Sequence, residues 1–215
     1  MKTVCLIPAR GGSKRIPKKN VKELQGIPLV AHSINKAKKI KLIDEVWVST
    51  EDKEIAEISK KYGAMVIERP KELALDTART ESVMVHFAKN VDFDNILLFE
   101  CTYPLTTADD LNQLIIKYSK SIWDSALSLK KTTDYVWKIN TDETAEPVSY
   151  KLGHNLRTQD YEGLYIESGG LYITSKKALL KSKCCVSGKI GYYVLPHPSF
   201  EIDTLDDFKI VESLL

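Results

Sequence analysis

Short apolar runs alternate with helical patterns from the start of the chain to residue 118. Apolar runs bounded by turn-forming residues are typical of buried strands, whereas apolar residues spaced three and four apart are typical of helices. A strand that repeatedly precedes a helix predicts an α/β fold with a doubly wound, mostly parallel sheet of the Rossmann type and helices on both faces. The expected strands are residues 3–7, 45–49, 64–67 and 95–99, and the expected helices are residues 29–40, 52–62, 80–88 and 108–118.

The pattern changes in the second half of the chain. Residues 132–163 are polar, dotted with aromatic side chains and weakly periodic, which favours an arm inserted into the main sheet. We therefore predict a single domain over residues 1–215 with a small inserted arm at about 131–167. Further strands are expected at residues 125–130, 170–173 and 192–195, and a last helix at about 205–214.

Overall charge and cysteine content exclude several classes of protein. Lys and Arg total 31 against 29 Asp and Glu, so the net charge of +2 is too small for a general nucleic-acid-binding surface. No uncharged apolar stretch approaches the length of about 18 residues that spans a membrane, and the N-terminal apolar run is too short for a signal peptide. The four cysteines form no C-x-x-C pair. We expect reduced thiols in a cytoplasmic protein with no membrane and no nucleic acid as partner.

The strongest candidate for a binding site is the basic loop, residues 8–20, which follows the first strand. Ligands of parallel sheets bind beyond the carboxyl ends of the strands, where this loop is expected. Gly11 and Gly12 let the backbone approach a phosphate closely, and Arg10, Lys14 and Lys19 supply positive charge. The loop matches neither the P-loop nor the dinucleotide-binding pattern. The alternative interpretation is a solvated basic turn.

The other end of the chain is acidic. Residues 201–212 hold five Asp or Glu and a single Lys. Glu201 and Asp203 are two apart in an extended segment, so both side chains face the same side, and two such carboxylates suit Mg²⁺ beside substrate phosphates. The alternative for this pair is an exposed strand end or a helix cap. Asp206 and Asp207 are expected in the first turn of the last helix, where the helix dipole favours negative charge.

Residues 7–20, Ile-Pro-Ala-Arg-Gly-Gly-Ser-Lys-Arg-Ile-Pro-Lys-Lys-Asn, resemble the nucleotide-binding loop of the acylneuraminate cytidylyltransferase family. The resemblance implies the fold of nucleotide-diphospho-sugar transferases, CTP and a sugar acid as substrates, Mg²⁺ as cofactor, and a homodimer in which the inserted arm crosses to the partner subunit. Further matches follow in order along the chain: Val48-Ser49-Thr50, Glu68-Arg69-Pro70, Glu72-Leu73, Asp76-Thr77-Ala78, Arg157-Thr158-Gln159-Asp160, Glu201-Ile202-Asp203-Thr204 and Asp207-Phe208.

The resemblance also implies which residues form the site. The nucleotide-binding set is Ala9, Arg10, Gly11, Gly12, Ser13, Lys14, Lys19, Asn20, Arg69, Ala78 and Thr80. The sugar-binding set is Glu100, Arg157, Gln159, Asp160, Ser168 and Gly169, with Arg157 on the sugar carboxylate. The metal set is Glu201 and Asp203, and the catalytic set is Arg10, Lys14, Lys19 and Asp203. Asp203 is the candidate proton acceptor for the attacking hydroxyl. The residues alone also allow a turn at Arg69, a helix cap at Thr80 and a charged loop at 157–160.

Several positions depart from the family pattern. The segment that is usually Leu-Gln-Pro-Thr-Ser-Pro-Leu-Arg is Phe-Glu-Cys-Thr-Tyr-Pro-Leu-Thr here, at residues 99–106. The glutamine that faces the sugar is therefore Glu100, and the arginine is Thr106. The usual Asn-Gly-Ala turn is Ser-Gly-Gly at residues 168–170. These departures lie on the acceptor side, where a carboxylate at Glu100 favours a hydroxyl or amino donor on the sugar.

Together these features predict a Mg²⁺-dependent cytidylyltransferase. It transfers CMP from CTP to the anomeric hydroxyl of a nine-carbon α-keto sugar acid, such as sialic, legionaminic or pseudaminic acid, and releases pyrophosphate. Two alternatives remain open. One is a nucleotidyltransferase of the same fold with an eight-carbon sugar acid, a phosphonate or a sugar phosphate as acceptor, or with GTP as donor. The other is a nucleotide-binding protein without catalysis.

Overall fold

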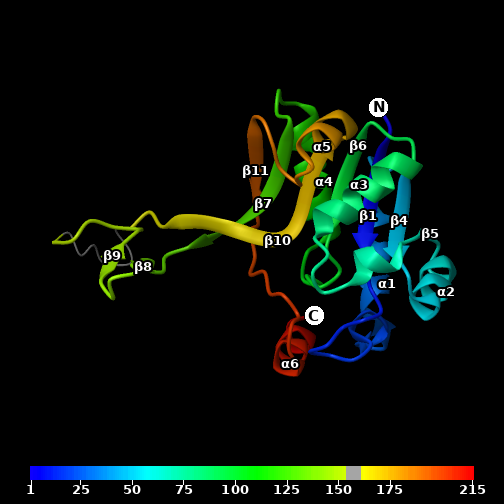
Figure 1. The fold of residues 1–215 in the computed structure, drawn as a ribbon, viewed down its shortest axis with the longest axis horizontal. Helices are drawn as coiled ribbons and strands as arrows, with labels where there is room; N and C mark the ends of the chain where they lie inside the picture. Colours follow the sequence, from blue (N-terminus) through cyan, green and yellow to red (C-terminus); the bar gives the residue numbers. More distant parts are fainter. Residues whose placement is uncertain (154–160) are drawn as a thin grey trace.

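A seven-stranded sheet forms the centre of the computed structural model, which describes residues 1–153 and 161–215 (Figure 1). Strands β1, β4, β5 and β6 pair in parallel, as do β7 and β11, whereas β10 is antiparallel to both of its neighbours, β6 and β7. The prediction of an α/β fold with a mostly parallel sheet is confirmed. In their order across the sheet the strands are β11 (Ile190–Val194), β7 (Ser125–Thr132), β10 (Leu164–Ser175), β6 (Asn95–Phe99), β1 (Thr3–Pro8), β4 (Glu45–Thr50) and β5 (Met65–Glu68).

Alternate residues of the central strand β1 pack into two different cores. Cys5 and Ile7 join the core under helices α1, α2 and α4, while Val4 and Leu6 join the core under α3 and α5. Because side chains alternate along a strand, one continuous apolar run supplies both layers. The helices are α1 (Leu29–Ala37), α2 (Lys53–Lys61), α3 (Thr80–Asn90), α4 (Ala108–Ser119), α5 (Lys176–Ser182) and α6 (Leu205–Leu214). Among the described residues, no helix is long and apolar enough to span a bilayer.

Helix starts follow local capping chemistry. Asp52 caps α2 with its side chain. Thr107 and Asp110 form a capping box at the start of α4, and Thr204 and Asp207 form one at the start of α6. The expected acidic first turn of α6 is present. These caps explain why the sequence located the starts of the three helices to within a residue or two.

The alternative role of Thr80 as a helix cap is wrong. Arg79 is the N-cap residue of α3 and Thr80 is its first helical residue. The Thr80 hydroxyl hydrogen-bonds to the carboxylate of Glu100 instead. The sequence also missed α5, a helix of seven residues, and several elements of two to four residues, which carry too little periodicity to be recognised. These short elements are the hairpin of β2 (Glu23–Leu24) and β3 (Ile27–Pro28) and two 3-10 turns, η1 (Lys19–Val21) and η2 (Lys71–Ala74).

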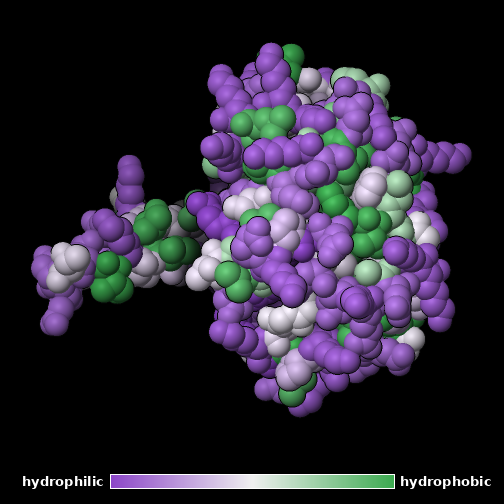
Figure 2. Space-filling model, turned by 45° about the vertical axis from the view of Figure 1, so that its right-hand side comes forward, coloured by the Kyte–Doolittle hydropathy of each residue, from purple (hydrophilic) through white to green (hydrophobic). Residues whose placement is uncertain are grey.

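The inserted arm projects from one side of the molecule (Figure 1). Strands β7 and β10 run out of the sheet into it, and a hairpin of β8 (Trp137–Ile139) and β9 (Ala145–Pro147) lies within it. Strand β10 begins at Leu164 rather than at residue 170, because it pairs with β7 on both sides of a bulge between Glu167 and Tyr172. Figure 2 shows apolar side chains on the surface of the arm. The large exposed ones are Tyr135, Val136, Trp137, Ile139, Val148, Leu152, Tyr165 and Ile166.

A third, smaller core joins the two ends of the chain. Ile16, from the basic loop, packs in one cluster with Ile202, Phe208 and Val211 from the C-terminal segment. In Figure 1 helix α6 accordingly lies beside the blue N-terminal loop. Residues Glu201 and Asp203 flank the fully buried Ile202, so this cluster brings the acidic end of the chain to the basic loop.

Candidate functional site

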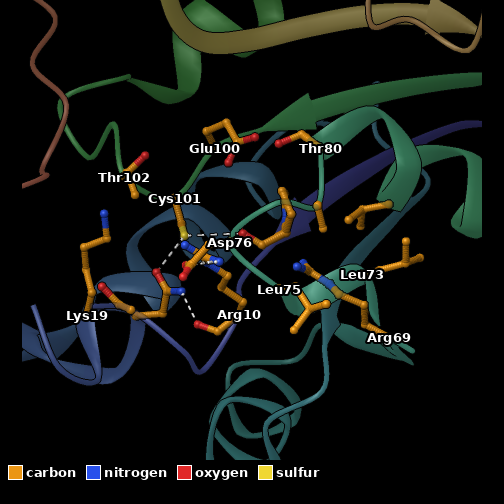
Figure 3. Close-up of a pocket in the computed structure, with 15 residues that line it drawn as sticks. Arg10, Lys19, Arg69, Leu73, Leu75, Asp76, Thr80, Glu100, Cys101 and Thr102 are labelled. Carbon is orange, nitrogen blue, oxygen red and sulfur yellow. Dashed lines mark hydrogen bonds and ion pairs between the residues drawn. The ribbon is translucent and has the colours of Figure 1, made fainter. Parts of the chain in front are cut away.

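Two pockets lie beyond the carboxyl ends of β1 and β6 and share a wall. Arg10, Lys19, Thr80, Glu100 and Thr102 line both. The first pocket, about 240 Å³, is lined by Pro8, Arg10, Ser13, Lys19, Asn20, Arg69, Leu73, Leu75, Asp76, Ala78, Thr80, Val83, Glu100, Cys101 and Thr102 (Figure 3). The second pocket, about 500 Å³, is lined by Arg10, Lys19, Thr80, Glu81, Leu98, Glu100, Thr102, Tyr103, Gly169, Tyr172, Cys185, Glu201 and Asp203.

Asp76 holds two cations of the basic loop. Its carboxylate accepts from Arg10 Nη1 at 2.9 Å and from Lys14 Nζ at 2.5 Å. The hydrogen bond from Lys14, its charge, and the contact with Arg10 lower the pKa of Asp76 below its usual value. Arg10 also donates to the carbonyl of Ala74 at 3.3 Å. Asp76 was not among the predicted site residues, since its only signal in the sequence was membership of a matched segment.

The loop backbone is fixed by β4 and by the start of α2. Ala9 is fully buried in the core, and its N–H donates to the carbonyl of Ser49 at 3.0 Å. Gly11 N–H donates to Glu51 at 2.8 Å, and a Cβ on Gly11 would lie 2.5 Å from the Asp52 carboxylate. Gly11 is therefore required for close approach to α2. The space where a Cβ of Gly12 would lie is open to 4 Å, and Ser13 lines the first pocket.

Asn20 links the basic loop to the end of β6. Its side-chain amide donates to the Arg10 carbonyl at 2.9 Å, and its amide oxygen accepts from the Cys101 thiol at 3.2 Å. Burial raises the pKa of Cys101 to about 12, so this thiol is neutral and serves as a donor. The network fixes the position of Arg10 relative to the floor of the first pocket.

Arg69, Ala78 and Thr80, three residues of the predicted nucleotide-binding set, line the first pocket. Arg69 is buried, and its guanidinium donates to the hydroxyl and the carbonyl of Ser49 at 3.2 and 2.7 Å. The N–H of Ala78 donates to the Leu75 carbonyl at 3.0 Å. This wall is thus held by main-chain bonds and by a buried cation, which suits recognition of a flat, polar group.

Glu100 directly follows β6 and lines both pockets. Burial raises the pKa of Glu100 to about 7, and the charge of Glu201 adds to the rise. A hydrogen bond from Thr80 and the positive charges of Arg69 and Lys19 oppose it. At neutral pH this carboxyl can therefore act either as a hydrogen-bond acceptor or, protonated, as a donor.

The acid pair, Glu201 and Asp203, lines the second pocket, while Ile202 between them is buried in the core. This is the alternation that the sequence predicted. Asp203 accepts from Arg15 Nη1 at 2.5 Å and lies 3.4 Å from Lys19 Nζ. Lys19 also donates to the carbonyl of Ile202 at 2.7 Å. Arg15 was not among the predicted site residues, although it lies in the basic loop.

The acid pair fits a hard divalent cation. Carboxylate oxygens are the ligands that Mg²⁺ prefers, and Mg²⁺ bound with phosphates takes only one or two of them from the protein. Among residues 1–153 and 161–215 there is no cluster of three or more His, Cys, Asp or Glu side chains arranged to hold a metal. The donor set therefore suits a cation that is completed by substrate phosphates and water.

Within the described part of the chain, only some of the predicted sugar-binding residues line the second pocket. Gly169 lines the second pocket with Glu100. Ser168 is buried beside it and shares a hydrogen bond with the hydroxyl of Ser128. Three further predicted residues, Arg157, Gln159 and Asp160, lie outside the described residues.

The fold is that of an α/β protein with a mostly parallel sheet, and its two adjoining pockets form the candidate site. The chain belongs to the cytidylyltransferase family, whose model, described as Cytidylyltransferase, matches residues 4–210. Over 226 residues it is 32% identical to the pseudaminic acid cytidylyltransferase of Campylobacter jejuni, a match that covers 100% of this chain and 96% of that protein. Over 212 residues it is 32% identical to N-acylneuraminate cytidylyltransferase A of Danio rerio, covering 96% of this chain and 49% of that protein.

A solved structure supports the fold. The CMP:2-keto-3-deoxy-manno-octonic acid synthetase complexed with CTP matches with a TM-score of 0.77 at 18% identity, covering 100% of this chain and 98% of that one. The resemblance to acylneuraminate cytidylyltransferases is confirmed by the relatives, and the chain is a nucleotidyltransferase.

Proposed function

We propose that this protein transfers CMP from CTP to the anomeric hydroxyl of a nine-carbon α-keto sugar acid and releases pyrophosphate. The observation that carries the proposal is the meeting of the basic loop with Glu201 and Asp203 at two pockets that share a wall. One pocket offers cations for a triphosphate, and the other offers space for an acceptor beside it. Pseudaminic and N-acylneuraminic acids, named in the relatives, are both nine-carbon acids.

The first pocket takes the nucleotide. Arg10 and Lys14 pair with Asp76, and Lys19 pairs with Asp203. These cations are close enough together to bind phosphates in place of the carboxylates. Ala9, Gly11 and Gly12 shape the loop on which those cations stand. We assign the triphosphate to Arg10, Ser13, Lys14, Lys19 and Asn20, and the cytidine to Arg69, Ala78 and Thr80.

The second pocket takes the sugar acid. The anomeric hydroxyl oxygen attacks the α-phosphorus in line, the bond from that phosphorus to the bridging oxygen of the β-phosphate breaks, and pyrophosphate leaves. Arg10 and Lys19 line both pockets and neutralise the charge that builds on the leaving group. Asp203 accepts the proton of the hydroxyl. Glu100, Ser168 and Gly169 border the acceptor.

Glu201 and Asp203 hold Mg²⁺ in this proposal. When bound, Mg²⁺ neutralises phosphate charge and favours departure of pyrophosphate. The sugar carboxylate is assigned to Arg157, with Gln159 and Asp160 beside it, on the resemblance alone. A guanidinium matches a carboxylate in a fork geometry.

We further propose a cytoplasmic homodimer. The exposed apolar side chains of the arm suit burial against a second copy of the chain. The four free thiols and the use of CTP suit a reducing compartment where nucleotides are made.

The test is pyrophosphate release with CTP and Mg²⁺ across a panel of acceptors. The panel holds sialic acid, its deaminated analogue, legionaminic acid, pseudaminic acid and an eight-carbon sugar acid. We expect release with one of the nine-carbon acids and its loss when EDTA removes the metal. In a parallel thermal-shift series, CTP should stabilise the protein more than GTP or UTP, because binding to the native state raises its stability.

Each contrary result points to a different alternative. Release with the eight-carbon acid alone would identify that acid as the acceptor. Stronger stabilisation by GTP than by CTP would identify GTP as the donor. CTP binding with no pyrophosphate released across the panel would favour a phosphonate or sugar-phosphate acceptor, or a nucleotide-binding protein without catalysis.

A further inference from the structure

The two members of the acid pair are held in different ways. Asp203 contacts the cations Arg15 and Lys19. Glu201 has a single hydrogen-bond partner among residues 1–153 and 161–215, the phenol of Tyr103, which donates to Glu201 Oε2 at 2.9 Å. A glutamate has one more rotatable bond than an aspartate and so loses more rotamer freedom when it is fixed. The longer side chain therefore depends on Tyr103 for its position.

The backbone around Tyr103 is itself fixed. Tyr103 stands in the loop between β6 and α4, where its N–H donates to the Glu100 carbonyl at 3.2 Å and its carbonyl accepts from Thr106 at 3.1 Å. Ile202 N–H donates to the Thr102 carbonyl at 2.8 Å, which joins this loop to the C-terminal segment. Tyr103 and Glu201 are therefore each one residue away from the hydrogen bond that joins their two segments.

Gly169 makes room for the phenol. Its φ of +82° is in the left-handed region, and a Cβ there would overlap the Tyr103 hydroxyl. A Cβ on the next residue, Gly170, would lie 3.3 Å from the Cβ of Tyr103.

We infer that Tyr103 is a positioning residue for metal binding by the acid pair. Its phenol fixes Oε2 of Glu201 and directs the remaining lone pairs of this carboxylate to the cation. The inference rests on the proposed function, in which Glu201 and Asp203 bind Mg²⁺. Hydrogen bonds to the carboxylates that ligate a metal typically contribute about 10–100-fold to metal affinity.

The experiment measures Mn²⁺ binding, with Mn²⁺ in place of Mg²⁺, by isothermal titration calorimetry with saturating CTP and no acceptor. Tyr103→Phe keeps the ring and removes the donor, so we expect the Kd for Mn²⁺ to rise about tenfold. The matched control is Tyr193→Phe. It removes a phenol that donates to Asp110 at 3.2 Å, outside both pockets, and should leave the Kd unchanged. Thermal unfolding of both variants verifies that they fold.

A double-mutant cycle tests whether Tyr103 acts through Glu201. Glu201→Ala alone should raise the Kd for Mn²⁺, and adding Tyr103→Phe should raise it no further. An unchanged Kd for Tyr103→Phe, or an equal effect with and without Glu201, would overturn the inference. So would an unchanged Kd with a raised KM for the sugar acid, which would assign the phenol to the acceptor.

The outcome for Tyr103 is separate from the outcome for the proposed function. If the wild-type protein binds Mn²⁺ with CTP through Tyr103 and Glu201 but releases no pyrophosphate, only the proposed reaction fails. If it binds no Mn²⁺ in the presence of CTP, both the metal assignment and this inference are overturned, and the pyrophosphate assay alone decides the reaction.

Discussion

At the scale of residues, the cations of the basic loop are already paired with carboxylates. Arg10 and Lys14 share Asp76, and Lys19 lies beside Asp203. The two ion pairs of Asp76 are more than one-third exposed and contribute little to stability, because water screens them. The carboxylates therefore hold the cations of the basic loop close to one another, and breaking these ion pairs costs little free energy. A triphosphate can then bind the cations in place of the carboxylates.

Removing one of these cations should impair the reaction far more than the fold. For Arg10→Ala we expect kcat/KM for CTP to fall by about 10²-fold or more, since phosphoryl transfer depends on positioned charge. Steady-state pyrophosphate release measures it. Lys120→Ala, an exposed cation at the end of α4, is the control and should leave kcat/KM unchanged. Near-normal turnover of a protein carrying both Arg10→Ala and Asp203→Ala would contradict the site.

The departures from the family pattern on the acceptor side are neighbours in space. The ring of Tyr103 lies against Gly169 and Gly170, and a Cβ on Gly170 would lie 3.2 Å from Thr106 Oγ1. These positions are far apart along the chain, yet a change at one alters the room available to the others. In the sequence they are separate substitutions, whereas in the structure they lie close together, with Glu100, Tyr103 and Gly169 lining the second pocket.

At the scale of elements, the segment from β11 to α6 decides where the acid pair lies. Two anchors hold it. Near its start, His197 Nε2 lies 2.7 Å from Asp110 Oδ2, at the start of α4. Near its end, the fully buried Ile202 packs with Ile16 and Phe208.

Ile202 should therefore matter for both stability and metal binding. Ile202→Ala leaves a cavity in a small core, and we expect it to lower the free energy of unfolding by about 2–4 kcal/mol. It should also weaken Mn²⁺ binding, because the carboxylates on either side lose their anchor. Urea unfolding and calorimetry measure the two effects. Ile210→Ala, on the exposed face of α6, should change stability by less than about 0.5 kcal/mol; equal effects of the two variants would rule out the anchor.

The other anchor predicts a pH dependence of stability. Both ring nitrogens of His197 face acceptors, the Asp110 carboxylate and the Pro198 carbonyl, and this favours the protonated ring. Burial lowers the pKa of His197, but the hydrogen bonds to Pro198 and Asp110 and the charge of Asp110 outweigh it, so the pKa is raised. A pKa above the unfolded value of about 6.5 gives stabilisation that is complete below that pH and is lost as pH rises through the folded pKa.

His197→Ala should therefore cost more stability at pH 6 than at pH 9, by on the order of 1 kcal/mol. Urea unfolding at both pH values measures the difference. Tyr193→Phe removes an uncharged donor from the same carboxylate, Asp110, and should cost the same at both. If the loss for His197→Ala does not change with pH, the imidazole is neutral in the folded protein and the anchor is a plain hydrogen bond.

At the scale of the whole molecule, the arm exposes apolar side chains that a single copy of the chain leaves uncovered. Its exposed apolar residues stand on a ribbon that projects from the sheet, where one copy of the chain offers little to cover them (Figure 2). Monomeric proteins rarely expose such patches without a partner. The arm therefore fits the proposed dimer.

Light scattering coupled to gel filtration should give twice the mass of the chain. Introducing Ile139→Asp together with Val148→Asp places charges on two of the exposed apolar positions of the arm, and we expect it to yield monomers. Lys138→Ala, on the same hairpin, removes an exposed ion pair with Glu146 and should leave the dimer intact. A monomeric wild-type protein would contradict the assignment.

Local patterns predicted most of the main elements but few of their contacts. The apolar runs of β1, β4, β5 and β6 and the capped helices α2, α4 and α6 were all recognisable, because burial and capping leave a signature within a few residues. The start of β10 was missed, because the bulge at Glu167–Tyr172 interrupts the alternation on which the prediction depends. The alternative of a helix cap at Thr80 was wrong, because its hydroxyl hydrogen-bonds to Glu100, a residue on another element.

The α/β order, the basic loop after the first strand and the acid pair near the end can all be predicted from the amino-acid sequence, because each is a local pattern of burial or charge. The contact between the loop and the acid pair, which joins Lys19 to Ile202 across 183 residues, is established by the fold alone. The fold also selected Asp76, Arg15 and Tyr103 as their partners. Those contacts follow from how the cores pack, and packing across such separations leaves no periodic trace in one sequence.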